Sequence, residues 1–227
     1  MPQPLHRVLP DAAFQATTKA LVDKPELARW VTIIFANCAL IEHYLSLLLV
    51  RILGADAAPA LAMFDTLTAK HLQFGALKAA AEAALSKQEH RVLIAGLKVA
   101  ERVRTPRNHL AHWIWGVCDQ LPNALLLAEP KAQKNRDREL LALALEKGET
   151  GILAIEQIER LMTYDPSTVL VYRIDDLERA ATDAIEARSV TFSVCNYLDP
   201  NHRAFRDHLF DFLCKQQLFR EAWDQTS

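Results

Sequence analysis

The sequence predicts a mainly α-helical protein, a helical bundle with a small β insertion. Glycine is scarce, with 6 residues among 227, while alanine and leucine are abundant, which favours helices with small and medium core side chains. Residues 26–53 are almost continuously apolar and end at Gly54, as expected of a long buried helix. Residues 119–174 differ, because short apolar and β-branched runs alternate there with turn residues.

Composition narrows the class of protein further. Apolar residues make up 51% and charged residues 24%, as in ordinary soluble domains, and the length suits one domain with an elaboration. The net charge of −2 argues against a surface that coats nucleic acid, although it leaves a local basic cleft open. The cysteines form no CxxC pair, so we expect a cytoplasmic protein without disulfides; they are Cys38, Cys118, Cys195 and Cys214. The first ten residues show no signal peptide.

The first elements are two helices separated by a break. Residues 11–22 are amphipathic and predict a short helix that Asp23-Lys24-Pro25 ends. Pro25 suits the first turn of the second helix, residues 26–53, which we expect at the centre of the bundle because it is apolar nearly all round. A membrane span is the weaker alternative, because the segment carries polar and charged residues that are costly in a bilayer: Asn37, Glu42, His43 and Arg51.

Four more helices complete the predicted bundle, residues 1–118. Residues 57–64 predict a short helix, and 69–85 and 88–104 predict two Ala- and Leu-rich helices with polar faces. Thr105 then suits an N-cap and Pro106 the first helical position of a helix that should end near Trp115-Gly116.

The chain after residue 118 is predicted to divide into an elaboration, residues 119–174, and C-terminal helices, residues 175–227, that pack on the bundle within a single domain. In the elaboration we expect strands at 116–119, 124–128 and 168–173, an exposed basic segment at 131–138, and short helices at 138–147 and 153–162. Asp175 can cap a helix that runs to Tyr197, with Glu178 completing a capping box. A last helix is expected over 201–223.

The functional signal lies in one hexamer, Arg107-Asn108-His109-Leu110-Ala111-His112. Arginine supplies a permanent forked positive charge, and histidine can exchange a proton near neutral pH. On a helix, Asn108 and His112 share a face, while Arg107 lies about 140° around and about 7.5 Å along the axis from His112. If the hexamer opens its helix, backbone N–H groups there would also attract an anion. The set therefore suits a phosphodiester.

At this hexamer the chain resembles the HEPN superfamily, helical bundles that carry Arg, four to six residues, then His. Arg107, Asn108 and His112 match the Arg-Asn-x-x-Ala-His version of that motif, and the resemblance extends over about residues 10–118. His109 departs from the pattern, since many members have an apolar residue there. The helices after residue 175 could also belong to the resemblance, whereas residues 119–174 look like an elaboration outside it.

The resemblance implies a dimeric, metal-independent endoribonuclease without a cofactor, in which attack by a ribose 2′-OH gives a 2′,3′-cyclic phosphate. Arg107 would hold the phosphate, His112 would transfer protons, and Asn108 would orient one of them. Such proteins often serve in toxin–antitoxin or anti-phage systems, so the expected partners are RNA, a second copy and a cognate antitoxin or inhibitor protein. The alternative is a non-catalytic helical module that binds RNA or proteins.

Several other residues near the hexamer or expected to face it have both a functional and a purely structural interpretation. Glu42 is either a carboxylate that orients Arg107 or His112, or half of a satisfied pair with His43. The basic series before the hexamer is either an RNA phosphate track, to which His109 could add, or a solvated helix face: Lys98, Arg102 and Arg104. Arg107 could be a surface ion-pair partner of Glu101, and Trp113 and Trp115 could stack bases or be structural. Glu42, His43 and His71 lack the spacing of a metal site, so no metal is expected.

Overall fold

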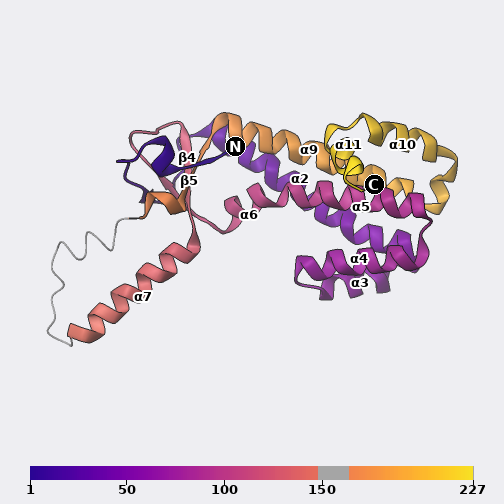
Figure 1. The fold of residues 1–227 in the computed structure, drawn as a ribbon, viewed down its shortest axis with the longest axis horizontal. Coiled ribbons are helices and arrows are strands. Elements are labelled where there is room, and N and C mark those ends of the chain that lie inside the picture. Colours follow the sequence, from indigo (N-terminus) through magenta and orange to yellow (C-terminus); the bar gives the residue numbers. More distant parts are fainter. Residues whose placement is uncertain (148–163, 227) are drawn as a thin grey trace. The chain divides into compact units, whose positions relative to one another are not determined.

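The computed structural model describes residues 1–147 and 164–226, and most of them are helical, with one small antiparallel sheet (Figure 1). The predicted class, mainly α with a β element, is confirmed in this form. The chain divides into a sheet unit, Met1–Thr32 with Asn108–Arg179, and a helical unit, Ile33–Arg107 with Ala180–Ser227. The boundary falls inside three helices, which are α2 (Pro25–Leu53), α6 (Arg104–His112) and α9 (Ile174–Tyr197).

Helix α2 agrees closely with its prediction, since it begins at Pro25 and stops before Gly54, whose φ of 56° suits glycine. Its buried side chains recur every three or four residues and so form one stripe: Leu27, Val31, Ile34, Cys38, Ile41, Leu45, Leu48 and Ile52. The helix is not buried on every face, since Leu40 lies outside this stripe and is 39% exposed. By length and composition alone α2 could cross a membrane, yet 44% of its most apolar window is buried inside the protein.

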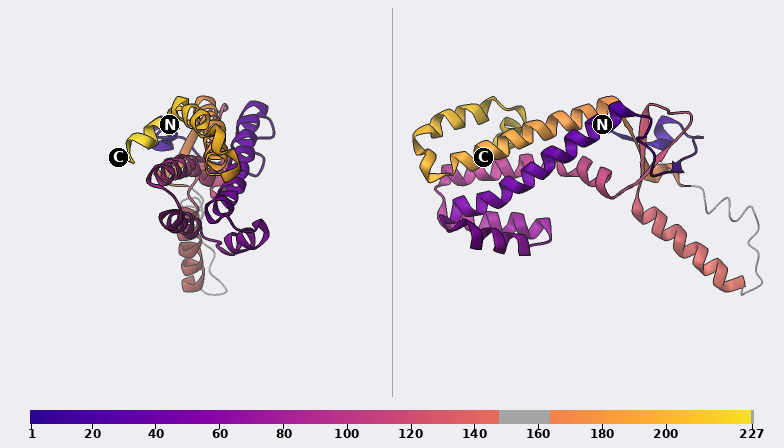
Figure 2. Two further views of the ribbon diagram at one scale, coloured as in Figure 1. Left: turned by 90° about the vertical axis from the view of Figure 1, so that its right-hand side faces the viewer. Right: turned by 180° about the vertical axis from the view of Figure 1, so that it is seen from behind.

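The helical unit contains three further predicted helices, and all three are confirmed: α3 (Ala57–Thr66), α4 (Lys70–Ala84) and α5 (Lys87–Arg102). Ser86 caps α5 in a capping box with Glu89. The single C-terminal helix predicted over 201–223 is wrong, because the chain forms a 3₁₀ helix, η3 (Pro200–Phe205), then α10 (Arg206–Lys215) and α11 (Gln217–Asp224). Gln216 is extended and separates the last two, and α11 packs on α5 (Figure 2).

The sheet unit is built on five antiparallel strands in the order β1-β5-β4-β3-β2. The strands expected at 124–128 and 168–173 are confirmed as β4 (Ala124–Ala128) and β5 (Val169–Arg173), whereas the strand expected at 116–119 begins and ends two residues earlier, as β3 (Ile114–Val117). The edges are two short strands that were not predicted, β1 (Gln3–Pro4) and β2 (Gln15–Ala16), with the one-turn helix α1 (Leu5–Val8) after β1. The helix predicted over 11–22 is therefore wrong, since that segment holds β2 followed by turns.

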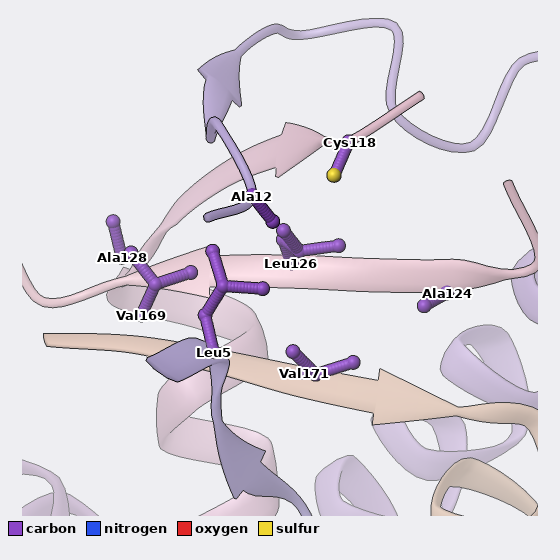
Figure 3. Close-up of a cluster of buried hydrophobic side chains, with 8 residues drawn as sticks. All are labelled: Leu5, Ala12, Cys118, Ala124, Leu126, Ala128, Val169 and Val171. Atoms are coloured by element: carbon purple, nitrogen blue, oxygen red, sulfur yellow. The ribbon is translucent and has the colours of Figure 1, made fainter. Parts of the chain in front are cut away.

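Both faces of the central strand β4 are buried. Alternate residues of β4 and β5, such as Leu126 and Val171, which are paired across the ladder, face a cluster that Leu5 and Ala12 complete (Figure 3). The intervening residues Leu125 and Tyr172 point to the opposite face and are 0% and 1% exposed. A strand buried on both faces reads as a continuous apolar run, as β4 does in the sequence.

Two details after the hairpin differ from expectation. Residues 131–138, predicted as an exposed basic segment before a short helix at 138–147, belong to the same helix, α7 (Pro130–Lys147), because Ala, Gln, Lys, Arg and Glu are good helix formers even without an apolar stripe. Asp175 does not cap α9: the helix begins at Ile174, and Asp176 accepts the backbone N–H of Arg173 at 3.2 Å. A short 3₁₀ helix, η2 (Pro166–Thr168), precedes β5. The helix predicted over 153–162 lies outside the described residues.

Candidate functional site

The hexamer lies on α6, as predicted, but the limits of the helix differ. Helix α6 begins at Arg104 and is separated from α5 by Val103 alone, so Thr105 is not its cap and Pro106 is its third residue. Proline is tolerated there because the first N–H groups of a helix have no acceptor within it. The helix ends at His112, and Trp115-Gly116, expected as its end, belong to β3.

This shift changes the electrostatics expected at the motif. Arg107 is the fourth residue of α6, while His112 is the last and so lies at the carboxyl end of the helix dipole. His112 therefore lies at the opposite end of α6 from the first-turn N–H groups that were expected to help bind an anion at the hexamer. An anion bound beside His112 would therefore have to be held by side chains, such as the guanidinium of Arg107.

Arg107 belongs to the helical unit, and its side chain is 30% exposed. Its Nη2 atom lies 3.9 Å from Oε1 of Glu42 on α2, and the same oxygen lies 3.3 Å from Nζ of Lys70 on α4. Glu42 therefore contacts Arg107, in line with its predicted orienting role. Cys38, one turn before Glu42, also faces these charges: burial raises its pKa to about 11, with Arg107 opposing the rise.

His109 is held in the sheet unit by two aromatic side chains. Its Nδ1 atom lies 2.7 Å from the hydroxyl of Tyr172 on β5, and its ring centroid lies 4.4 Å from that of Trp113. Burial lowers the pKa of His109, and burial together with Asp176 raises the pKa of Tyr172. An imidazole held by these two aromatic side chains anchors the end of α6 and is not an obvious RNA-binding group.

His112 and Asn108 complete the motif on the same helix. His112 is exposed, and within residues 1–147 and 164–226 its side chain has no hydrogen bond or ion pair. Asn108, one turn earlier, is partly buried and has a partner. The arrangement leaves His112 open to a substrate, which is what proton transfer to or from a bound molecule requires.

The predicted basic track does not form a continuous surface with Arg107. Lys98 donates to the backbone oxygen of Gln225 at 2.8 Å, and Arg102 pairs with Glu221 on α11. Arg104 lies over the ring of Phe74, 5.6 Å from its centroid. All three side chains thus have partners within the helical unit, and the structure does not bring them together with the motif arginine.

Sequence reasoning missed two residues that contact the site, Lys70 and Tyr172. Neither has a local signal, since each reaches its partner only through the tertiary fold. Trp115, considered for base stacking, donates through Nε1 to the carbonyl of Leu110 at 2.8 Å and so fixes the turn from α6 into β3. Among the described residues, no three His, Cys, Asp or Glu side chains gather in a way that could hold a metal ion.

The chain was compared with protein families, curated proteins and solved structures. No family model, no curated protein and no solved structure matches the chain.

Proposed function

We propose that this protein is a metal-independent endoribonuclease of the HEPN type, in which Arg107 binds the scissile phosphate and His112 transfers protons. The observation that carries the proposal is that the side chains of Arg107 and His112 are both accessible to solvent. Arg107 is oriented by Glu42 yet 30% exposed, and His112, in the last turn of the same helix, is exposed. An arginine held by a carboxylate is preorganised, so little entropy is lost when a phosphate binds.

The chemistry needs one proton acceptor and one proton donor. The imidazole of one His112 removes the proton from a ribose 2′-OH, and O2′ attacks the adjacent phosphorus. The bond from phosphorus to the 5′-oxygen breaks, and that oxygen takes a proton from an imidazolium on the opposite side. The products are a 2′,3′-cyclic phosphate and a 5′-hydroxyl. Arg107 stabilises the negative charge that grows on the phosphoryl oxygens.

The second imidazole is the reason to propose a homodimer. Each chain supplies a single His112, whereas in-line displacement places the base and the acid on opposite sides of phosphorus. A two-fold axis beside α6 would bring a second His112 to the phosphate. His109 does not replace it, because its Nδ1 atom is engaged by Tyr172 and its ring by Trp113.

The test is cleavage of mixed RNA in EDTA, which suppresses metal-dependent contaminants. Arg107→Ala and His112→Ala should each slow cleavage by at least about 100-fold. Matched controls are Arg220→Ala and His71→Ala, which remove the same side chains from exposed positions on α11 and α4 and should leave the rate unchanged. Equal rates in all four variants would exclude the assignment. RNA that is bound but never cut would instead favour the non-catalytic RNA-binding alternative.

A further inference from the structure

A groove of about 850 Å³ lies in the helical unit, between α2, α9, η3 and α10. Its walls are largely aromatic, and three phenylalanines that line it are unusually open to solvent. Phe192 is 49% exposed, Phe205 59% and Phe212 40%. The ring of Tyr44 on α2 lies 5.3 Å from that of Phe192 and also lines the groove. Exposed apolar side chains that gather in one concavity mark a binding site more often than chance.

Arg188 is the one described lining residue of the groove with a permanent charge, the other polar lining residues are serine, asparagine and histidine, and no carboxylate from the described part of the chain lines the groove. Arg188 on α9 has no ion-pair or hydrogen-bond partner among the residues that the structure describes. His208 on α10 likewise has none there, and His202 lies 3.9 Å from Asp199. Asp199 is 4% exposed and is already bound by Arg51 at 3.0 Å, so it does not neutralise the groove.

The groove is separate from the motif. Tyr44 and Glu42 are two residues apart on α2, which places them about 200° apart around the helix axis. Glu42 contacts Arg107, whereas Tyr44 lines the groove, so the two surfaces flank opposite sides of the buried stripe of α2. A molecule bound in the groove would leave Arg107 uncovered.

We propose that this groove binds a small amphipathic organic anion, a carboxylate or similar acid with an apolar body. The volume lies within the range of about 300–1,000 Å³ that small-molecule pockets occupy, and apolar walls with few polar groups are typical of them. The apolar body lies against Phe192, Phe205 and Tyr44. The acid group pairs with Arg188, whose fork of donors matches a carboxylate. The wall formed by α9, from Arg188 to Asn196, is about 12 Å long, which is short for a protein interface that buries about 800 Å² per partner.

Isothermal titration calorimetry with decanoate, below the concentration at which it forms micelles, tests the proposal. Decanoate should bind with one site per chain, and decylammonium, which has the same tail and the opposite charge, should bind at least about tenfold more weakly. Arg188→Gln should weaken decanoate binding about fivefold. The matched control is Lys78→Gln, which removes a positive charge from an exposed position on α4 and should leave the affinity unchanged.

Phe192→Ala provides a second variant, because a side chain that is 49% exposed can be removed without opening the core. It should weaken decanoate binding about tenfold and leave the helical circular dichroism and the molar mass unchanged. Equal affinity for decylammonium, or no effect of Arg188→Gln, would overturn the proposal. A fall in molar mass on Phe192→Ala would also overturn it, since a second copy would then cover the groove. RNA cleavage is not part of this test, so its outcome is independent of the proposed ribonuclease activity.

Discussion

Replacing Tyr172 with Phe removes one hydroxyl and keeps the ring that fills the sheet face behind α6. The hydroxyl lies 2.7 Å from Nδ1 of His109, and Tyr172 is 1% exposed, so water does not readily replace it. A hydrogen bond of this kind contributes about 1 kcal/mol net to the free energy of unfolding. In a chain of 227 residues that loss corresponds to a fall of about 2–4 °C in Tm.

The assay is urea unfolding of Tyr172→Phe, His109→Ala and the double variant, followed by circular dichroism. The coupling free energy from this cycle should be about 1 kcal/mol, because each single change removes the same contact. Tyr44→Phe is the matched control: its hydroxyl has no hydrogen bond among the described residues, and its loss should cost less than about 0.5 kcal/mol. A coupling energy of zero would refute the idea that Tyr172 anchors α6 through His109.

Three other predictions follow from the described contacts. Glu42→Gln should lower the RNA cleavage rate about tenfold through loss of guanidinium orientation, and it should cost less than about 1 kcal/mol of stability because the pair is partly exposed. The control Lys70→Gln removes the other partner of Glu42 and should change the cleavage rate and the stability little. Equal rate losses in the two variants would contradict the orienting role of Glu42. Gly116→Ala should lower the free energy of unfolding in urea by about 1–3 kcal/mol, because a Cβ there would lie 2.5 Å from a backbone oxygen of β2. The control Gly75→Ala, on α4 with no atom near the new Cβ, should raise it by about 0.5–1 kcal/mol. An unchanged stability of Gly116→Ala would contradict the close approach of β2 to Gly116. The free energy of unfolding should fall as the pH drops from 8 to 5, because the unfolded chain protonates His109 near its ordinary pKa of 6.5 while burial lowers that pKa in the folded protein. His109→Gln should flatten this pH profile, and an unchanged profile in that variant would contradict the role of His109.

The long helices were predictable because their signals are local. Residues 26–53 combine a proline start, an apolar run and a glycine stop, and the structure begins and ends α2 at those points. The hairpin β3–β4 was predictable for the same reason, since Pro122 and Asn123 separate two apolar runs. In both cases the pattern of a single segment is sufficient.

The wrong secondary-structure predictions occur where contacts with distant parts of the chain determine the local structure. Residues 11–22 have a helical pattern, yet Gln15 and Ala16 form an edge strand because they pair with Val117 and Gly116, about a hundred residues later. The C-terminal helix breaks at Gln216, one residue before α11, whose Leu218 N–H donates to Glu186 of α9 at 2.7 Å. No local signal marks either event.

The candidate site likewise has some features that the local sequence predicts and others that only the tertiary fold determines. The hexamer, its helix and the spacing of Arg107, Asn108 and His112 could be read from the sequence. The start of α6 at Arg104 could not, because proline in a first turn is compatible with several helix starts. Glu42 was a candidate from its place on α2, but Lys70 and Tyr172 enter only through the tertiary fold.

The most direct test of the central claim is to map RNA ends after incubation with the protein in EDTA. The wild-type protein should release fragments that end in a 2′,3′-cyclic phosphate, and it should not cut at a position where the 2′-OH is replaced by hydrogen. His112→Ala should release none, with its fold intact by circular dichroism. The same cyclic-phosphate fragments from His112→Ala, or cleavage at the 2′-deoxy position, would contradict the account.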